Sequence, residues 1–124
     1  MASEGGRETS YVGAWRQSTE PLSVGILGLG RAGAALAGEL SRSPIRLAGI
    51  WNRSHRLLPE ELEGIPFTSG TDLPPPSLLE GANVLLLTVH DSAIAELSGR
   101  LSVPGGTVVL HCSGALGAEA LSQL

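Results

Sequence analysis

Hydrophobic residues along this chain form short runs separated by turn residues. The runs at residues 22–27, 45–51, 82–89 and 107–110 have the length and the Val, Ile and Leu content of buried strands, and a brief run at residues 65–68 indicates one more. The third of the longer runs is apolar on both faces, as expected for a central strand covered by helices on either side. The pattern therefore predicts an α/β fold with a doubly wound parallel sheet of about five strands.

Between these strands the apolar spacing changes to that of helices. Residues 31–40 place Leu36 and Leu40 on one helical face, and residues 92–101 show the same spacing. Asp91 immediately precedes the second of these helices, so its carboxylate is expected to cap the helix N-terminus.

Prolines divide the segment at residues 57–80 into shorter pieces. We expect a one-turn helix at residues 60–62, opened by Pro59 and ended by Gly64, and a helical turn at residues 77–79. The glutamates of this segment have no histidine at ligand spacing beside them, so no metal site is predicted.

The first strand leads directly into glycines spaced as G-x-G-x-x-G, at Gly28, Gly30 and Gly33. In a strand–turn–helix unit the first glycine permits the tight turn, the second lets backbone approach a pyrophosphate, and the third lets helix and strand pack closely. A glycine-rich hairpin and a membrane-spanning segment at residues 21–40 are the alternatives, although Arg31 in mid-span would cost several kcal/mol in a membrane. The strand that follows the helix favours a dinucleotide-binding loop.

The end of the second strand carries Asn52, Arg53 and Ser54. An NAD site usually has an acidic residue at this place for the ribose hydroxyls, and the sequence has none there. The forked donors of Arg53 suit a 2′-phosphate, so NADP is favoured over NAD. The alternative is a solvated arginine, with Ser54 capping the following turn.

Polar residues also follow the later strands, and the carboxyl ends of parallel strands share one crevice. Thr88, Val89 and His90 are expected on the nicotinamide side, where His90 either meets the cofactor or only closes the crevice. Ser113 is expected to donate a hydrogen bond towards cofactor or substrate, and Cys112 to fill space. The histidine two residues before Ser113 would face the opposite way on an extended chain, so no nucleophile–base pair is predicted.

No catalytic residue and no metal ligand is assigned from the sequence. The residues expected to bind the cofactor are Gly28, Leu29, Gly30, Arg31, Ala32, Gly33, Asn52, Arg53, Ser54, Thr88, Val89, His90 and Ser113.

Length and composition narrow the function further. The 124 residues allow one domain, expected at residues 21–124 behind a flexible polar tail at residues 1–20. A net charge of −4 gives no basic footprint for nucleic acid, and the single cysteine excludes an internal disulfide. The tail has no apolar export segment, so a cytoplasmic protein without membrane partners is expected. Helical spacing continues up to Leu124 without a cap, which indicates a truncated chain.

Taken together, the segments at residues 24–33, 51–54, 85–94 and 108–116 resemble those of a Rossmann-like family of unknown function. In that family the NADP-binding half precedes a helical C-terminal domain. The family is similar in turn to pyrroline-5-carboxylate reductase, 6-phosphogluconate dehydrogenase and deazaflavin-dependent NADP reductases. The resemblance extends over residues 22–124.

The resemblance implies a pyrophosphate at residues 28–33, the adenosine 2′-phosphate at residues 52–54 and the nicotinamide side at residues 88–91. Family members commonly have proline at the place of His90 and threonine at the place of Cys112. The C-terminal domain that supplies substrate contacts in such enzymes does not follow in this sequence.

Two functions remain open on these observations. The first is the cofactor-binding part of an NADP-dependent oxidoreductase, inactive without its second domain and acting on an unidentified small molecule. The second is a module that binds or senses a nucleotide without turning it over. Methyltransferases and flavoproteins rank lower, because they too would need an acidic residue at the second strand end. A sheet that ends near Leu110 leaves an edge open for pairing with a second copy.

Overall fold

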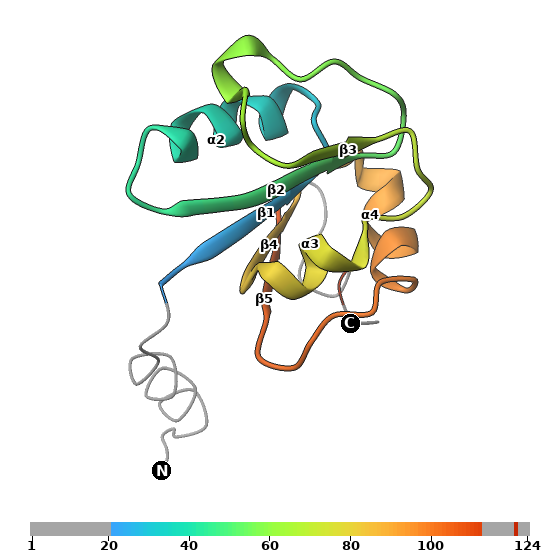
Figure 1. Ribbon diagram of the computed structural model, residues 1–124. Helices are drawn as coiled ribbons and strands as arrows, with labels where there is room; N and C mark the ends of the chain where they lie inside the picture. The colour runs from blue at the N-terminus through green and yellow to red at the C-terminus, as the bar shows by residue number, and fades with distance from the viewer. Residues whose placement is uncertain (1–20, 113–120, 122–124) are drawn as a thin grey trace.

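The computed structural model describes residues 21–112 and Leu121, and these residues build one five-stranded sheet in the order β3-β2-β1-β4-β5 (Figure 1). Every neighbouring pair of strands is parallel. The strands are β1 (Ser23–Leu27), β2 (Arg46–Asn52), β3 (Phe67–Ser69), β4 (Val84–Leu87) and β5 (Val108–His111). The predicted parallel sheet is therefore confirmed.

Helices cover both faces of this sheet (Figure 1). The helix α2 (Arg31–Ser41) and the 3-10 turn η1 (Glu60–Leu62) pack on one face, whereas α3 (Pro76–Gly81) and α4 (Asp91–Ser98) pack on the other. The chain crosses to the second face between β3 and β4, because β3 lies at one edge of the sheet whereas β4 lies beside β1 on the side opposite β2. The predicted doubly wound α/β fold is confirmed by this arrangement.

Alternation along the strands divides the hydrophobic core into two layers. Beneath α2, Val24, Ile26 and Ile50 pack with apolar residues of α2 and η1. Beneath α3 and α4, Leu27 and Trp51 pack with the apolar residues of those helices. Since neighbouring residues of one strand serve opposite layers, β1 and β2 are apolar almost throughout, as the sequence pattern requires of central strands.

Several element boundaries differ from those expected. The strand expected at residues 82–89 spans only Val84–Leu87, because Ala82 is the C-cap of α3 and the chain bends at Val89. The helix expected at residues 92–101 spans Asp91–Ser98, although Leu101 still packs against the core.

The prediction that Asp91 caps α4 is wrong. His90 occupies the N-cap position with extended backbone, and no side chain caps the helix by a hydrogen bond. The helix begins one residue earlier than expected, so Asp91 lies in its first turn. An acidic residue in a first turn still interacts favourably with the positive end of the helix dipole. The expected tail at residues 1–20 and the helical spacing up to Leu124 lie outside the described residues, apart from Leu121.

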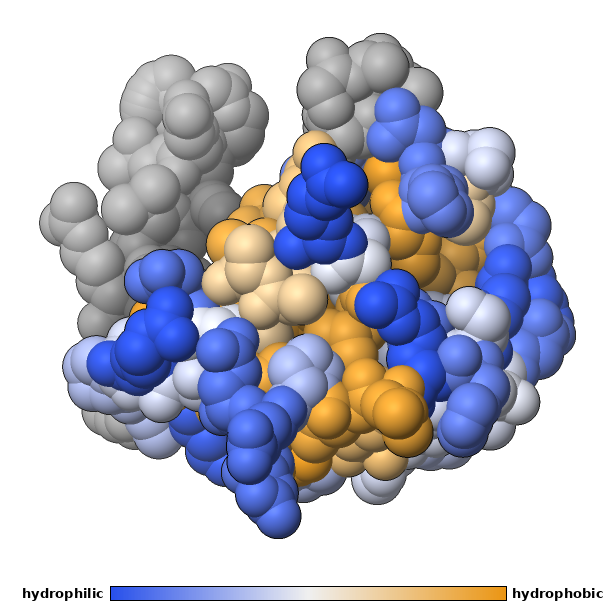
Figure 2. All heavy atoms as spheres, turned by 90° about the horizontal axis from the view of Figure 1, so that it is seen from above, coloured by the Kyte–Doolittle hydropathy of each residue, from blue (hydrophilic) through white to orange (hydrophobic). Residues whose placement is uncertain are grey.

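Hydrophilic side chains surround a more hydrophobic area on the face seen in Figure 2. Among the described residues, the large apolar side chains that stand exposed are those of Leu57 and Leu110. None of the helices in residues 21–112 has the length and apolar content that crossing a membrane requires.

The turn between β1 and α2 is held by close backbone packing. Gly28 has a φ of +121°, and a Cβ at this position would lie 2.7 Å from the backbone of Thr88. A Cβ at Gly33 would lie 1.8 Å from the Gly28 carbonyl oxygen. Neither backbone atom can move without shifting a strand, so only glycine fits at both positions.

We expect Gly33→Ala to lower the free energy of unfolding by about 3 kcal/mol, because the new methyl group collides with the backbone of the turn. Gly81→Ala is the matched control, since a Cβ at Gly81 meets nothing within 4 Å. Urea unfolding of both variants measures the difference. Equal stability of the two variants would show that the close packing at Gly33 is not a constraint.

Candidate functional site

A cavity of about 900 Å³ opens at the carboxyl ends of the strands. The turn after β1, the end of β2, the segment between β4 and α4, and Cys112 after β5 all contribute to its wall. Most of the predicted cofactor residues line it, namely Gly28, Gly30, Arg31, Ala32, Asn52, Arg53, Ser54, Thr88, Val89 and His90. Folding thus brings three separate sequence segments to one crevice, as the strand-end argument requires.

The remaining predicted residues do not line the cavity. Leu29 is 1% exposed and belongs to the core beneath α2. Gly33 packs against Gly28, as described above, and so shapes the turn from behind. Ser113 lies outside the described residues, and its expected role stays a prediction.

The N-terminus of α2 faces the cavity with its amide groups uncapped. Gly30 is the N-cap residue with extended backbone, no side chain caps the helix, and its first turn contains no acidic residue. A Cβ built at Gly30 meets no atom within 4 Å, so the space in front of this backbone is open. Unpaired N–H groups at a helix N-terminus attract anions, and open space lets an anion approach them.

The Asn52 side chain fastens this turn to the end of β2. Its Oδ1 accepts a hydrogen bond from the Leu29 backbone N–H at 2.8 Å, and its Nδ2 donates to the Ser54 carbonyl at 2.7 Å and the Ser54 hydroxyl at 3.1 Å. The carboxamide is therefore engaged within the protein. Asn52 lines the cavity but acts mainly by positioning its neighbours.

Thr88 fastens the same turn from the other side. Its hydroxyl is buried and donates to the Gly28 carbonyl at 2.6 Å, with the Leu27 carbonyl 3.3 Å away. The hydroxyl is thus committed to the turn after β1. The backbone at Gly28 is held rigidly between β2 and β4 as a result.

Further residues line the cavity that sequence reasoning did not assign to it. These are Trp51, Arg56, Ser92, Ala93, Leu97 and Cys112, while Asp91, which the resemblance alone placed on the nicotinamide side, lines the cavity as well. Ser92, Ala93 and Leu97 belong to α4, which begins after the short segment at residues 88–90 that follows β4. The rule that places ligands at strand ends could have found these first-turn residues, whereas nothing local to Leu97 indicates that it reaches the crevice.

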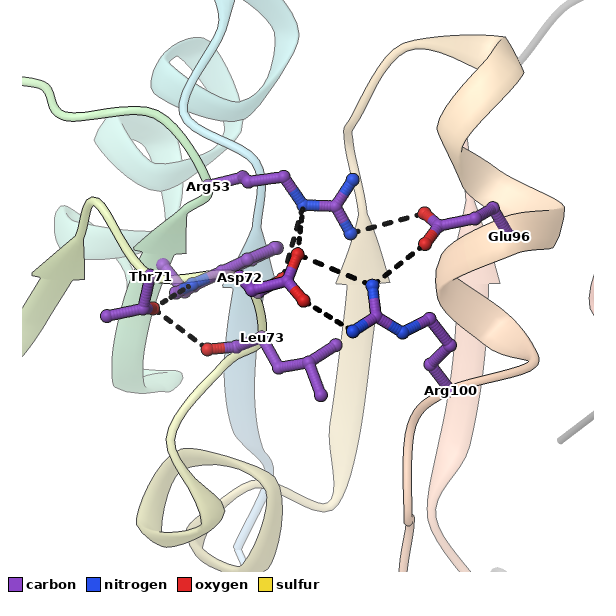
Figure 3. Close-up of polar contacts among 7 residues, drawn as sticks. Arg53, Thr71, Asp72, Leu73, Glu96 and Arg100 are labelled. Atoms are coloured by element: carbon purple, nitrogen blue, oxygen red, sulfur yellow. Dashed lines mark hydrogen bonds and ion pairs between the residues drawn. The ribbon is translucent and has the colours of Figure 1, made fainter.

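Beside the cavity, Arg53 lies in a network of ion pairs that the sequence did not indicate (Figure 3). Its Nε donates to the Asp72 backbone carbonyl at 3.2 Å, and its Nη2 donates to Glu96 Oε1 at 3.2 Å. Arg100 donates to the second carboxylate oxygen of Glu96 at 2.9 Å and makes a close bidentate contact with the Asp72 carboxylate. No acidic residue stands at the end of β2 or in residues 53–56, yet the fold brings two carboxylates to Arg53 from the β3–α3 loop and from α4.

The network shifts the pKa values of Asp72, Glu96 and Arg100 so that their charged forms are favoured. Hydrogen bonds from Arg100 chiefly lower the pKa of Asp72 and that of Glu96, while Arg53 adds a smaller effect. The pKa of Arg100 is raised by the same two carboxylates. The formal charges of the two arginines and the two carboxylates sum to zero.

Comparison with known proteins gives a match to a family model and to a solved structure. The model of the Rossmann-like domain matches residues 8–124. The crystal structure of a glycerol-3-phosphate dehydrogenase from Coxiella burnetii is similar with a TM-score of 0.59 and 20% sequence identity, over 82% of this chain and 37% of that one. This chain thus spans well under half the length of the dehydrogenase. A search of curated proteins found no match.

We expect the ion-pair network to lose its contribution to stability in acid. The pKa values of Asp72 and Glu96 in the folded state lie below their ordinary values of 3.8 and 4.5. Their contribution is therefore complete above these ordinary values and disappears as the pH falls through the lowered folded values. The double variant Asp72→Asn, Glu96→Gln should have a lower Tm than the wild type near neutral pH, and the difference should shrink below about pH 4. A Tm difference that is constant into strong acid would contradict this.

Proposed function

This chain belongs to the Rossmann-like domain family, and we propose on that premise that it binds a nicotinamide dinucleotide at the carboxyl ends of its strands, as the cofactor-binding part of an oxidoreductase. The observation that carries the proposal is the uncapped N-terminus of α2, which opens onto the cavity at Gly30 with free space in front of it. This is where a dinucleotide pyrophosphate binds in such folds.

The residues present fit each part of the cofactor. The amide groups of the first turn of α2 would bind the pyrophosphate, and the open space at Gly30 would admit it. Arg53 and Ser54, at the end of β2, would hold the adenosine end. The segment from Thr88 to His90, after β4, would flank the nicotinamide.

Arg53 supports NADP as the preferred cofactor. It lines the cavity at the position where NAD-specific proteins have an acidic residue, and Arg56 lines the same cavity nearby in sequence. Hydrogen bonds from a guanidinium to a phosphate contribute about 1.5–3 kcal/mol, whereas a ribose hydroxyl gains much less from a cation. We therefore propose that the 2′-phosphate distinguishes the two cofactors at this strand end.

When bound, the nicotinamide supplies the hydride chemistry, and the residues of this chain orient the cofactor. The name of the similar structure, a glycerol-3-phosphate dehydrogenase, supports the same class of reaction.

A nucleotide-binding module without turnover is the second candidate. Within residues 21–112 and Leu121, no group of three or more His, Cys, Asp or Glu side chains could hold a metal ion. The charged side chains around Arg53 are paired with one another. A full-length protein that binds NADPH and never oxidises it with carbonyl, imine or hydroxy-acid substrates would favour this candidate.

Titration with NADPH and NADH, followed by nicotinamide fluorescence, tests the proposed function. We expect both to bind, NADPH about ten- to a hundredfold more tightly, and we expect Arg53→Ala to remove most of that difference by weakening NADPH alone.

Arg42→Ala provides the matched control, because Arg42 is exposed near the end of α2 and pairs with Glu39 instead of lining the cavity. Its affinities should equal those of the wild type. Absent binding of both coenzymes would overturn the proposed function, and equal binding of both would overturn the NADP preference.

A further inference from the structure

We propose that Glu96 limits how strongly this site prefers a 2′-phosphorylated dinucleotide, by holding a negative charge against the arginine that would recognise the phosphate. The inference rests on the proposed function and names a specificity-determining residue for it. Glu96 lies on α4, forty-three positions along the chain from Arg53, and is not itself a cavity-lining residue.

Arg53 lies between the cavity and the helix α4. Its side chain lines the cavity, and its contact with Glu96 runs from the end of β2 to α4 (Figure 3). The Arg53 and Glu96 side chains are 39% and 44% exposed. The pair therefore lies at the open edge of the cavity, where a bound adenosine phosphate would meet it.

The ion-pair network uses two of the three guanidinium nitrogens of Arg53. The network engages Nε with the Asp72 carbonyl and Nη2 with Glu96, whereas Nη1 donates to none of the residues that the structure describes. Figure 3 shows Nη1 directed away from both carboxylates. A phosphate can thus be bound through Nη1 while Glu96 keeps its own contact, so the phosphate and the carboxylate would share one guanidinium.

The charges of the network around Arg53 affect how strongly it attracts a phosphate. Arg53 and Arg100 carry two positive charges, and Asp72 and Glu96 cancel them, so a dianionic phosphate meets a network with no net charge. Like charges held near one cation repel each other, and partial exposure reduces the effect without removing it. A cofactor without the 2′-phosphate brings no such charge to Arg53, so its binding affinity should not depend on Glu96.

Glu96→Gln separates this charge effect from the positioning of Arg53. The amide has the same shape, and its single oxygen can still accept the hydrogen bond from Arg53 Nη2, whereas the contact of Arg100 with the second carboxylate oxygen is lost. Arg53 also keeps the bond from Nε to the Asp72 backbone carbonyl, which no side-chain substitution removes. Loss of the charge with retention of the Arg53 contacts should therefore strengthen phosphate binding.

The test is calorimetric titration of the wild type and Glu96→Gln with NADP⁺ and NAD⁺ at low salt. We expect the NADP⁺ affinity of the variant to rise roughly five- to tenfold and the NAD⁺ affinity to change less than about twofold. The gain should largely disappear near 1 M salt, where charges are screened within about 3 Å.

Glu39→Gln is the matched control, since Glu39 is also an exposed carboxylate paired with an arginine, but on α2. Its affinities should not change, because it removes the same net charge at a residue that pairs with Arg42 and does not line the cavity. Asp72→Asn is a second variant of the same network and should raise NADP⁺ affinity in the same direction, which maintains the test if thermal unfolding shows that Glu96→Gln is not folded.

The outcomes separate the inference from its premise. A wild type that binds both nucleotides, with an NADP⁺ to NAD⁺ affinity ratio that is unchanged or lower in the network variants, overturns the role of Glu96 and leaves the proposed function standing. A gain of equal size in Glu39→Gln reduces the effect to net charge and overturns it as well. A wild type that binds neither nucleotide overturns the proposed function and, with it, this inference.

Discussion

The close approach of backbone at the β1–α2 turn is the constraint on which the site depends. Gly28 adopts a left-handed backbone against Thr88, and Gly33 lies against the Gly28 carbonyl with no room for a side chain. This contact brings the N-terminus of α2 to the ends of β1 and β4. Asn52 and the Thr88 hydroxyl then hold the turn from both sides. The open backbone at Gly30 is a consequence of that packing, since the turn is rigid while its outer surface is uncovered.

Much of the fold could be predicted from the sequence because it depends on local rules. Buried parallel strands must be apolar on both faces, so the apolar runs around Ile26, Ile50 and Leu85 can be recognised as such strands from the sequence. The glycines at 28, 30 and 33 follow each other at the spacing that the turn requires. Boundaries do not follow from the apolar pattern, because a strand or a helix ends where its backbone hydrogen bonds end. Asp91 shows this, as a shift of one residue moved it from the cap into the first turn of α4.

The surroundings of Arg53 could not be predicted in the same way. Its partners are Asp72, in the loop between β3 and α3, and Glu96, on the helix α4 that follows β4. No repeat of apolar or charged residues along the chain relates these positions to Arg53. Only the reversal of strand order, which brings α4 beside the end of β2, makes them neighbours. The sequence thus indicates that a cation stands where a carboxylate is usual. It does not indicate that carboxylates from distant parts of the chain pair with that cation. With these carboxylates, the ion-pair network at the proposed adenosine end has no net charge instead of a positive one.

The account depends on an anion that binds against the backbone at Gly30, and Gly30→Ala tests this most directly. A Cβ here meets no protein atom, and its φ of −86° is open to any residue, so the free energy of unfolding should change by less than about 1 kcal/mol. The methyl group would project into the path of the pyrophosphate, so NADPH affinity should fall at least about tenfold. A folded Gly30→Ala protein that binds NADPH as tightly as the wild type would contradict the account.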